Sequence, residues 1–126
     1  MMERAYDSAS YDPPAPVVDV FFSPPGDPLT RVWALALADT GADISVIGPG
    51  IASRLGLPLV GRTQVAGVNE EAEIAPVWRV TVHTTLFGKF DIDAIELGGT
   101  TIIGRDILNR VSLHFDGPKT MLRASS

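Results

Sequence analysis

The sequence predicts an all-β domain, either a barrel or a sandwich, with one or two short helices. Runs of β-branched and aromatic residues recur along the chain, and glycine and proline separate them at short intervals. Only two segments have the composition of a helix, and both are short. A chain of 126 residues can bury one hydrophobic core but not two. These observations together favour one β-rich domain.

The strands are expected where apolar runs alternate with turns. Residues 1–16 are polar and end in a proline cluster, so they predict a flexible tail ahead of a domain that spans residues 17–124. Dense turn signals follow, as in Ser-Pro-Pro-Gly-Asp-Pro at residues 23–28. The expected strands are residues 17–22, 29–38, 60–66, 74–84, 90–97, 101–103, 111–115 and 120–123.

Two segments predict helix. Residues 49–55 have a proline near the start and are followed by Gly56, which is the usual asymmetry of helix ends. Residues 105–110 are a second, single-turn candidate. Beyond it, Asp-Gly-Pro-Lys at residues 116–119 predicts a turn between the last two strands, so the chain should end in a hairpin.

The composition excludes several classes of chemistry. The chain has no cysteine, which excludes disulfides, zinc thiolates, iron–sulfur clusters and a cysteine nucleophile, and which fits the reducing cytoplasm where we expect the protein. The net charge of −5 argues against nucleic acid or an anionic membrane as a partner. No apolar run has the length of a membrane span, and the first residues lack the layout of a signal peptide. The two histidines have no carboxylate at ligand spacing, so no metal and no other cofactor is expected.

The most informative segment is residues 35–47, Leu-Ala-Leu-Ala-Asp-Thr-Gly-Ala-Asp-Ile-Ser-Val-Ile. A carboxylate, Asp39, ends an apolar strand, and a hydroxyl residue and a glycine follow before the chain becomes apolar again. Gly41 would let the backbone come close to a ligand or to a symmetry mate. By itself, this pattern also fits an aspartate with a purely structural role in a strand-to-loop turn.

A second segment decides between these interpretations. In residues 101–108, Thr-Ile-Ile-Gly-Arg-Asp-Ile-Leu, an apolar strand, a glycine and an arginine lead into a short helix. Together with Asp-Thr-Gly-Ala-Asp at residues 39–43, it resembles the retroviral-type aspartic proteases, the retropepsins, in order and in separation. The resemblance covers about residues 17–122. It implies a closed acid-protease barrel that forms a two-fold symmetric dimer and acts as an endopeptidase on peptide or protein substrates.

The resemblance also implies the active site. Asp39 matches the catalytic aspartate, Thr40 the hydroxyl residue that bonds across the dimer axis, and Gly41 a residue whose carbonyl accepts from the substrate backbone. Two carboxylates held close together cannot both ionise, so they share a proton, and one can activate a water while the other donates to the peptide carbonyl. Because the chain has a single Asp-Thr-Gly, the second carboxylate must come from another copy. A homodimer is therefore required.

Other positions match supporting and substrate-binding residues. Asp43 matches a substrate-contacting residue that also pairs with Arg105, and we expect that pair to be partly buried, bidentate and joined to the short helix. Ala42 and Gly104 match residues that support the loop. Residues 67–73 lie where the family has its flap, although one glycine and three glutamates there also fit a solvated hairpin tip. The positions that match substrate contacts are Gly41, Asp43, Val68, Asn69, Ile102 and Ile103, of which the last fits a core position equally well.

A second hypothesis stays open, namely a catalytically silent module of the same fold that dimerises or binds peptides. An acidic pH–rate profile on peptides, with and without an inhibitor that mimics the transition state, would discriminate between the two. A glycosidase would use similar paired carboxylates, but aromatic residues make up only 7% of the chain, which leaves little to stack on a sugar.

Overall fold

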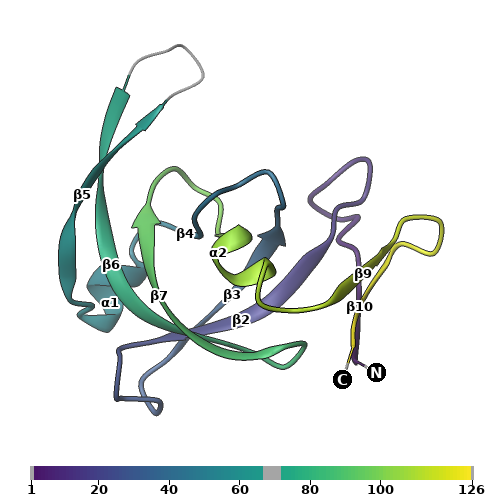
Figure 1. Ribbon diagram of the computed structural model, residues 1–126, viewed down its shortest axis with the longest axis horizontal. Coiled ribbons are helices and arrows are strands. Elements are labelled where there is room, and N and C mark those ends of the chain that lie inside the picture. Colours follow the sequence, from purple (N-terminus) through teal and green to yellow (C-terminus); the bar gives the residue numbers. More distant parts are fainter. Residues whose placement is uncertain (1, 67–71, 126) are drawn as a thin grey trace.

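The structure, a computed structural model, describes residues 2–66 and 72–125. Within these residues, pairing between neighbouring strands forms a closed ring (Figure 1). The ring closes because β6 pairs with both β7 and β2. The predicted all-β barrel with two short helices is therefore confirmed. The six strands, in the order of the ring, are β2 (Val17–Ser23), β3 (Val32–Ala38), β8 (Ile102–Ile103), β4 (Val46–Ile47), β7 (Gly88–Glu96) and β6 (Ala72–Thr84).

The alternation of side chains along the strands places the core inside the ring. In β2, Val18, Val20 and Phe22 are buried, whereas Asp19 and Phe21 are half-buried on the outer face. The same two-residue period runs through most of β7, where charged side chains are exposed and apolar side chains are buried. Burial of these apolar surfaces, at about 25 cal/mol per Å², provides the main drive for closing the barrel.

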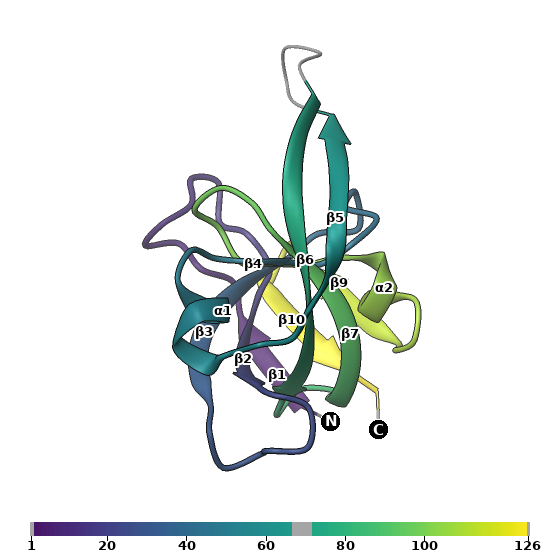
Figure 2. The same ribbon diagram turned by 90° about the vertical axis from the view of Figure 1, so that its left-hand side faces the viewer.

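The two helices are one or two turns long. The first, α1 (Ile51–Leu55), lies between Gly50 and Gly56, which both have a positive φ, 83° and 62°, that favours glycine. The second, α2 (Arg105–Leu108), begins directly after Gly104. The helices lie on opposite sides of the barrel in Figure 2. In the described part of the chain, neither helix has the length to cross a lipid bilayer.

A long hairpin projects from the barrel. Within the described residues, β5 (Leu59–Ala66) pairs only with β6, and the two strands extend away from the ring in both views (Figures 1 and 2). This is the hairpin for which the sequence predicts a flap. The predicted substrate contacts at Val68 and Asn69 lie outside the described residues.

The ends of the chain form a second, smaller sheet. Strand β10 (Met121–Ala124) pairs with β9 (Leu113–Asp116) on one side and with β1 (Met2–Ala5) on the other. The predicted C-terminal hairpin is thus confirmed. The start of the chain differs from the flexible tail predicted for residues 1–16, because residues 2–5 are a paired strand. Their partner is far away along the chain, so local composition did not reveal it.

Arg123 holds the three strands of this sheet together. Its guanidinium donates to a carboxylate oxygen of Glu3 on β1 (3.1 Å) and to one of Asp116 on β9 (2.8 Å). The hydrogen bond from Arg123, followed by one from the Lys119 N–H, holds the pKa of Asp116 below its ordinary value. The same carboxylate raises the pKa of Arg123.

An Asp116→Asn variant should be less stable than the wild type at neutral pH and equally stable in strong acid. The pKa of Asp116 in the folded state lies below its ordinary value of 3.8. Its charge therefore stabilises the folded state fully above that value, and this contribution is lost as the pH falls through the lowered folded pKa. Thermal unfolding followed by circular dichroism across a pH series would measure it. A difference that stays constant at every pH would contradict the assignment to the charge.

Candidate active site

Asp39 lies where β3 ends and the chain turns sharply. Its N–H donates to the carbonyl of Ile103 on β8 (3.0 Å), and its own carbonyl accepts from the N–H of Ala42 (3.2 Å), which closes a tight turn over Asp-Thr-Gly-Ala. Strands β3 and β8 run parallel here. The barrel therefore brings the two sequence motifs side by side, although about sixty residues separate them, as expected for a crossover between parallel strands.

The turn fixes the carboxylate of Asp39. The N–H of Gly41 donates to Oδ1 of Asp39 (2.9 Å). A Cβ atom on residue 41 would lie 3.1 Å from the same oxygen, which is tighter than ordinary side-chain packing, so glycine allows the amide to come this close. Asp39 itself is half-buried, and Thr40 and Gly41 are exposed. The carboxylate is thus held in place near the surface, where a substrate or a second copy can reach it.

Arg105, the first residue of α2, binds the turn through three hydrogen bonds. Its backbone N–H donates to the carbonyl of Ala42 (2.8 Å), and its guanidinium donates to the carbonyl of Thr40 and to Oδ1 of Asp43, both at 2.6 Å. The predicted pair of Asp43 and Arg105 is confirmed. The prediction that it is bidentate was wrong, because one N–H goes to the Thr40 carbonyl. The predicted partial burial holds for Arg105 but not for Asp43, whose side chain is 87% exposed. Arg105 therefore orders the backbone on both sides of Gly41.

Gly104 is the point of closest contact between the two motifs. A Cβ atom here would lie 2.8 Å from the carbonyl oxygen of Ala42 and 2.9 Å from the carbonyl carbon and oxygen of Ile44. These are backbone atoms of the active-site loop, so they cannot move aside cheaply. The φ of Gly104 is −98°, which other residues also adopt. Close contact, and not backbone conformation, requires the glycine.

A network of hydrogen bonds behind the turn, centred on Ser45, was not predicted from the sequence. The hydroxyl of Ser45, which is buried, donates to Oδ1 of Asp106 (2.6 Å) and accepts from the N–H of Gly104 (3.0 Å). The N–H of Ser45 donates to the other carboxylate oxygen of Asp106 (2.9 Å). A signal was present in the sequence, because Ser45 interrupts the apolar run at residues 44–47 and a buried hydroxyl needs a partner.

The two isoleucines predicted to contact substrate have different environments. Ile103 is fully buried in the barrel core, so its side chain does not reach a substrate and the core alternative applies. Its carbonyl serves the site instead, by holding the Asp39 N–H. Ile102 is half-buried and packs against a smaller apolar cluster that includes Val46, Ala75 and Ile95.

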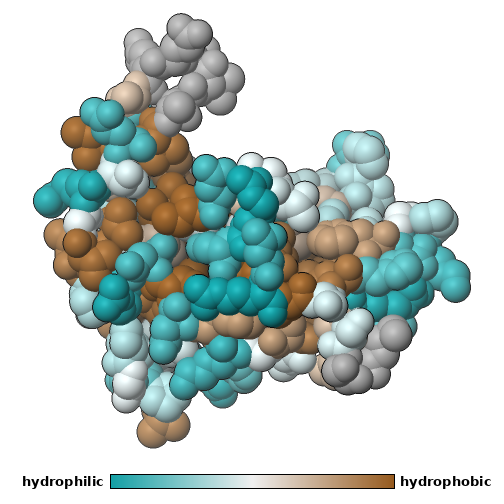
Figure 3. All heavy atoms as spheres, in the orientation of Figure 1, coloured by the Kyte–Doolittle hydropathy of each residue, from teal (hydrophilic) through white to brown (hydrophobic). Residues whose placement is uncertain are grey.

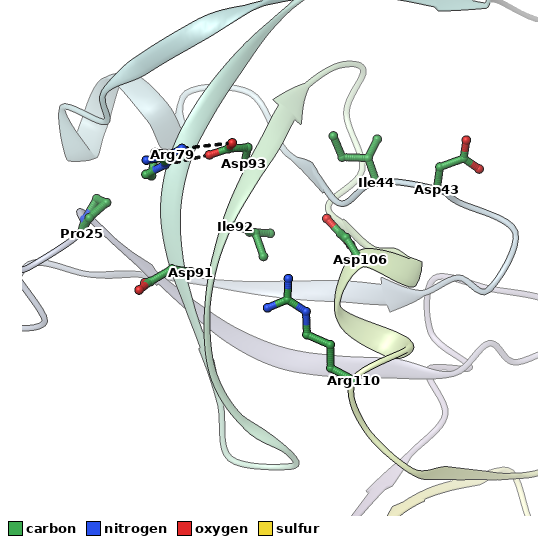
Figure 4. Close-up of a pocket in the computed structure, with 9 residues that line it drawn as sticks. All are labelled: Pro25, Asp43, Ile44, Arg79, Asp91, Ile92, Asp93, Asp106 and Arg110. Atoms are coloured by element: carbon green, nitrogen blue, oxygen red, sulfur yellow. Dashed lines mark hydrogen bonds and ion pairs between the residues drawn. The ribbon is translucent and has the colours of Figure 1, made fainter.

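A charged hollow of about 560 Å³ lies beside this loop (Figure 4). Asp43 and Ile44 line it together with residues of β6, β7 and α2, whereas Asp39 does not. Hydrophilic side chains gather over β7 and α2 in Figure 3. The four aspartates that line the hollow already have hydrogen-bond partners, namely Arg105 for Asp43, Thr81 for Asp91, Arg79 for Asp93 and Ser45 for Asp106. The hydrogen bond from Arg79 also lowers the pKa of Asp93.

No group of three or more histidine, aspartate or glutamate side chains within residues 2–66 and 72–125 is arranged to hold a metal ion.

The chain belongs to the aspartyl protease family. A model of that family, described as aspartyl protease, matches residues 32–107, which include both motifs. The fold is retropepsin-like, since two solved structures superpose on the chain. A retropepsin-like aspartic protease from Rickettsia conorii does so with a TM-score of 0.63 at 17% identity, over 99% of this chain and 92% of that one.

The second structure is EIAV protease complexed with the inhibitor HBY-793, with a TM-score of 0.58 at 22% identity, over 82% of this chain and 91% of that one. At such identities the likeness concerns the fold alone. No curated protein sequence matches the chain significantly.

Proposed function

We propose that the protein is an aspartic endopeptidase that hydrolyses peptide bonds with a water held between the Asp39 carboxylates of two copies. One observation carries the proposal. In a chain of the aspartyl protease family, Asp39 stands on a tight turn with its carboxylate fixed by the Gly41 N–H and accessible from outside. Carboxylates in such a place are suited to move protons to and from a bound substrate.

The reaction follows from two such carboxylates in contact. Like charges at short range cannot both persist, so the pair holds one proton between them. The ionised carboxylate takes a proton from the water as it attacks the peptide carbonyl, and the protonated one donates to the carbonyl oxygen. The carboxyl that took the water proton then gives it to the amide nitrogen as the C–N bond breaks, and a hydroxyl of the tetrahedral intermediate returns a proton to the other carboxylate. The pair again holds one proton, and no covalent bond to the enzyme forms.

Neighbouring groups are placed to bind an extended peptide. The carbonyl of Gly41 can accept from a substrate N–H. Asp43 uses Oδ1 for Arg105, which leaves Oδ2 for a second substrate N–H. The β5–β6 hairpin adds apolar surface, because Leu59, Val60 and Ile74 are exposed on it, and apolar side chains gather along it in Figure 3. An apolar substrate side chain that reaches the hairpin would bury part of this surface.

The requirement for a second copy follows from the count of motifs. The chain contains one Asp-Thr-Gly, so a single copy supplies one carboxylate. A two-fold axis is the commonest way to bring identical residues face to face. The resemblance of the two motifs to the retroviral-type proteases implies a two-fold symmetric dimer, which supports the same assembly here.

Specific activity should therefore rise with protein concentration. At concentrations well below the dimer dissociation constant, the cleavage rate should grow as roughly the square of concentration, because only the paired form is active. Cleavage of a peptide library at acidic pH, measured beside the solution mass over the same dilution series, would test it. Full specific activity in samples whose mass is that of a monomer would contradict the paired site. Binding of peptides without any cleavage would favour the silent module.

A further inference from the structure

A second hollow lies at the opposite end of the barrel from Asp39. It has a volume of about 290 Å³ and is formed by β2, the β2–β3 connection, β6 and the start of β7. Arg31, which lines it, precedes β3, and Asp39 follows β3. At about 3.3 Å per residue, these two positions are roughly 25 Å apart. In Figure 1 the β2–β3 connection and the active-site loop accordingly lie at opposite ends of the barrel.

The strand register builds the floor of this pocket. Phe21 pairs with Trp33 on one side and with His83 on the other, and His83 pairs in turn with Lys89. Residues paired directly across neighbouring strands share a face of the sheet. The outer face therefore carries two aromatic rings, an imidazole and an ammonium group in one row across four strands, and all of them except the Trp33 ring line the pocket.

Arg31 lies against this floor. Its guanidinium carbon is 4.8 Å from the centre of the Phe21 ring. A guanidinium over a ring gains a cation–π attraction, and its fork of N–H groups suits a planar, two-oxygen acceptor. Pro28, in the β2–β3 connection, also lines the hollow, and the neighbouring Leu29 is 92% exposed. The pocket thus combines an apolar floor and rim with directed cationic donors.

The two cations of this pocket, Arg31 and Lys89, have no carboxylate bound to them among the described residues. Arg4, Arg79, Arg105 and Arg123 form ion pairs with described residues, whereas the pocket's two cations, like four others on the chain, form none with them. Asp91 shares the face of β7 with Lys89 and accepts from the Thr81 hydroxyl (2.5 Å). Neither Asp91 nor Asp27 in the connection forms an ion pair with Arg31 or Lys89. The whole chain carries a net charge of −5. A cationic pocket on an acidic protein indicates an anionic ligand.

We propose that this pocket, here called the Arg31 pocket, docks an acidic peptide segment of a partner protein. An apolar side chain of that segment would lie against Phe21, and a flanking carboxylate would accept from Arg31 and Lys89. The volume stands at the lower limit of ligand pockets, which suits one side chain. A nucleic acid is disfavoured, because phosphate binding relies on many cations along a stripe. The docking does not depend on cleavage; where the proposed function holds, it gives substrates a second attachment point.

Binding of a labelled Glu-Glu-Phe-Glu-Glu peptide would test the proposal. The full chain would carry Asp39→Asn, so that the result is independent of cleavage, and fluorescence anisotropy would follow a protein titration. In that background, Arg31→Gln should weaken binding about tenfold, the usual value of a hydrogen bond between charged groups, and Lys89→Gln should also weaken it. Lys119→Gln removes the same charge in the exposed β9–β10 turn and should change binding by less than about twofold.

Four outcomes would overturn the proposal. If Lys119→Gln weakens peptide binding as much as Arg31→Gln does, the effect comes from the net charge of the protein and not from the pocket. If Glu-Glu-Ala-Glu-Glu binds as tightly as the phenylalanine peptide, the apolar floor does not contribute to binding. If free glutamate binds as tightly, the ligand of the pocket is a small anion and not a peptide. Displacement of the peptide by duplex DNA or anionic vesicles at lower concentration than by unlabelled peptide would assign the pocket to that other class. Reversal of all four side-chain charges of the peptide, in Lys-Lys-Phe-Lys-Lys, should abolish binding.

Discussion

Replacing Asp39 with asparagine should lower the rate of peptide cleavage by about 10³-fold or more, since acid–base catalysis by a positioned group is worth 10²- to 10⁴-fold and the homodimer loses both carboxylates. An amide can neither take a proton from water nor give one to the substrate in the same cycle. The fold should persist, because the asparagine side-chain oxygen can still accept from the Gly41 N–H. Cleavage assays combined with thermal unfolding and solution mass would separate loss of chemistry from loss of structure.

A matched control is available in Asp27→Asn, which makes the same change in an exposed connection and should leave cleavage of short peptides unchanged. Mixing provides a second check. If each active unit needs two copies of Asp39, an equal mixture of wild type and variant that exchange subunits freely should have about one quarter of the activity of pure wild type at the same total protein concentration. Retention of one half would mean that each chain acts alone, which would contradict the shared site. Full cleavage by a folded Asp39→Asn protein would exclude the aspartic mechanism.

The parts of the fold that the sequence predicted are those with a local cause. Strand β2 has an apolar side chain at each inward position, and the turn after it is dense in glycine and proline, so its type and limits could be predicted. Asp39 and Arg105 could be placed together only through the resemblance of two motifs that lie far apart in the chain. Periodicity alone left Asp39 as an ordinary turn residue.

The parts that the sequence did not predict depend on long-range contacts. Strand β1 exists because β10 supplies its partner and Arg123 reaches Glu3, 120 positions away. Strand β4 has only two residues and is fixed by β7 and β8 on either side. Arg105 does not pair with Asp43 in a bidentate way because the turn presents the Thr40 carbonyl beside the Asp43 carboxylate, and one guanidinium N–H group donates to that carbonyl instead. None of these contacts leaves a periodic signal in sequence.

The supporting contacts explain how a short turn keeps a defined geometry before any partner binds. Arg105 holds the outer side of the turn through the Thr40 carbonyl and Asp43, and Ser45 holds its inner side through Asp106. Both sets of contacts flank Gly104, whose N–H donates to the Ser45 hydroxyl. In the proposed dimer, the second copy would then have to supply only its own carboxylate, since each copy already orders that carboxylate by itself.

A Gly104→Ala variant should lose about 3 kcal/mol of folding stability, at the upper end of the usual cost of overpacking, and its melting temperature should fall by about 10 °C. The added methyl group would meet the carbonyl oxygen of Ala42 at 2.8 Å and the carbonyl group of Ile44 at 2.9 Å. Relief requires that the loop move away from α2, which breaks the bond from the Arg105 N–H to Ala42. Thermal unfolding by circular dichroism would measure the loss.

Gly99→Ala is the control for this substitution, because a Cβ atom there would have no heavy atom within 4 Å and the residue does not need a positive φ. Its melting temperature should stay close to that of the wild type. In the fraction of Gly104→Ala that remains folded, cleavage should also fall, because displacement of Ala42 moves the turn that positions Asp39. A variant that melts and cleaves like the wild type would show that the loop tolerates this displacement, and would contradict the contact as the reason for glycine.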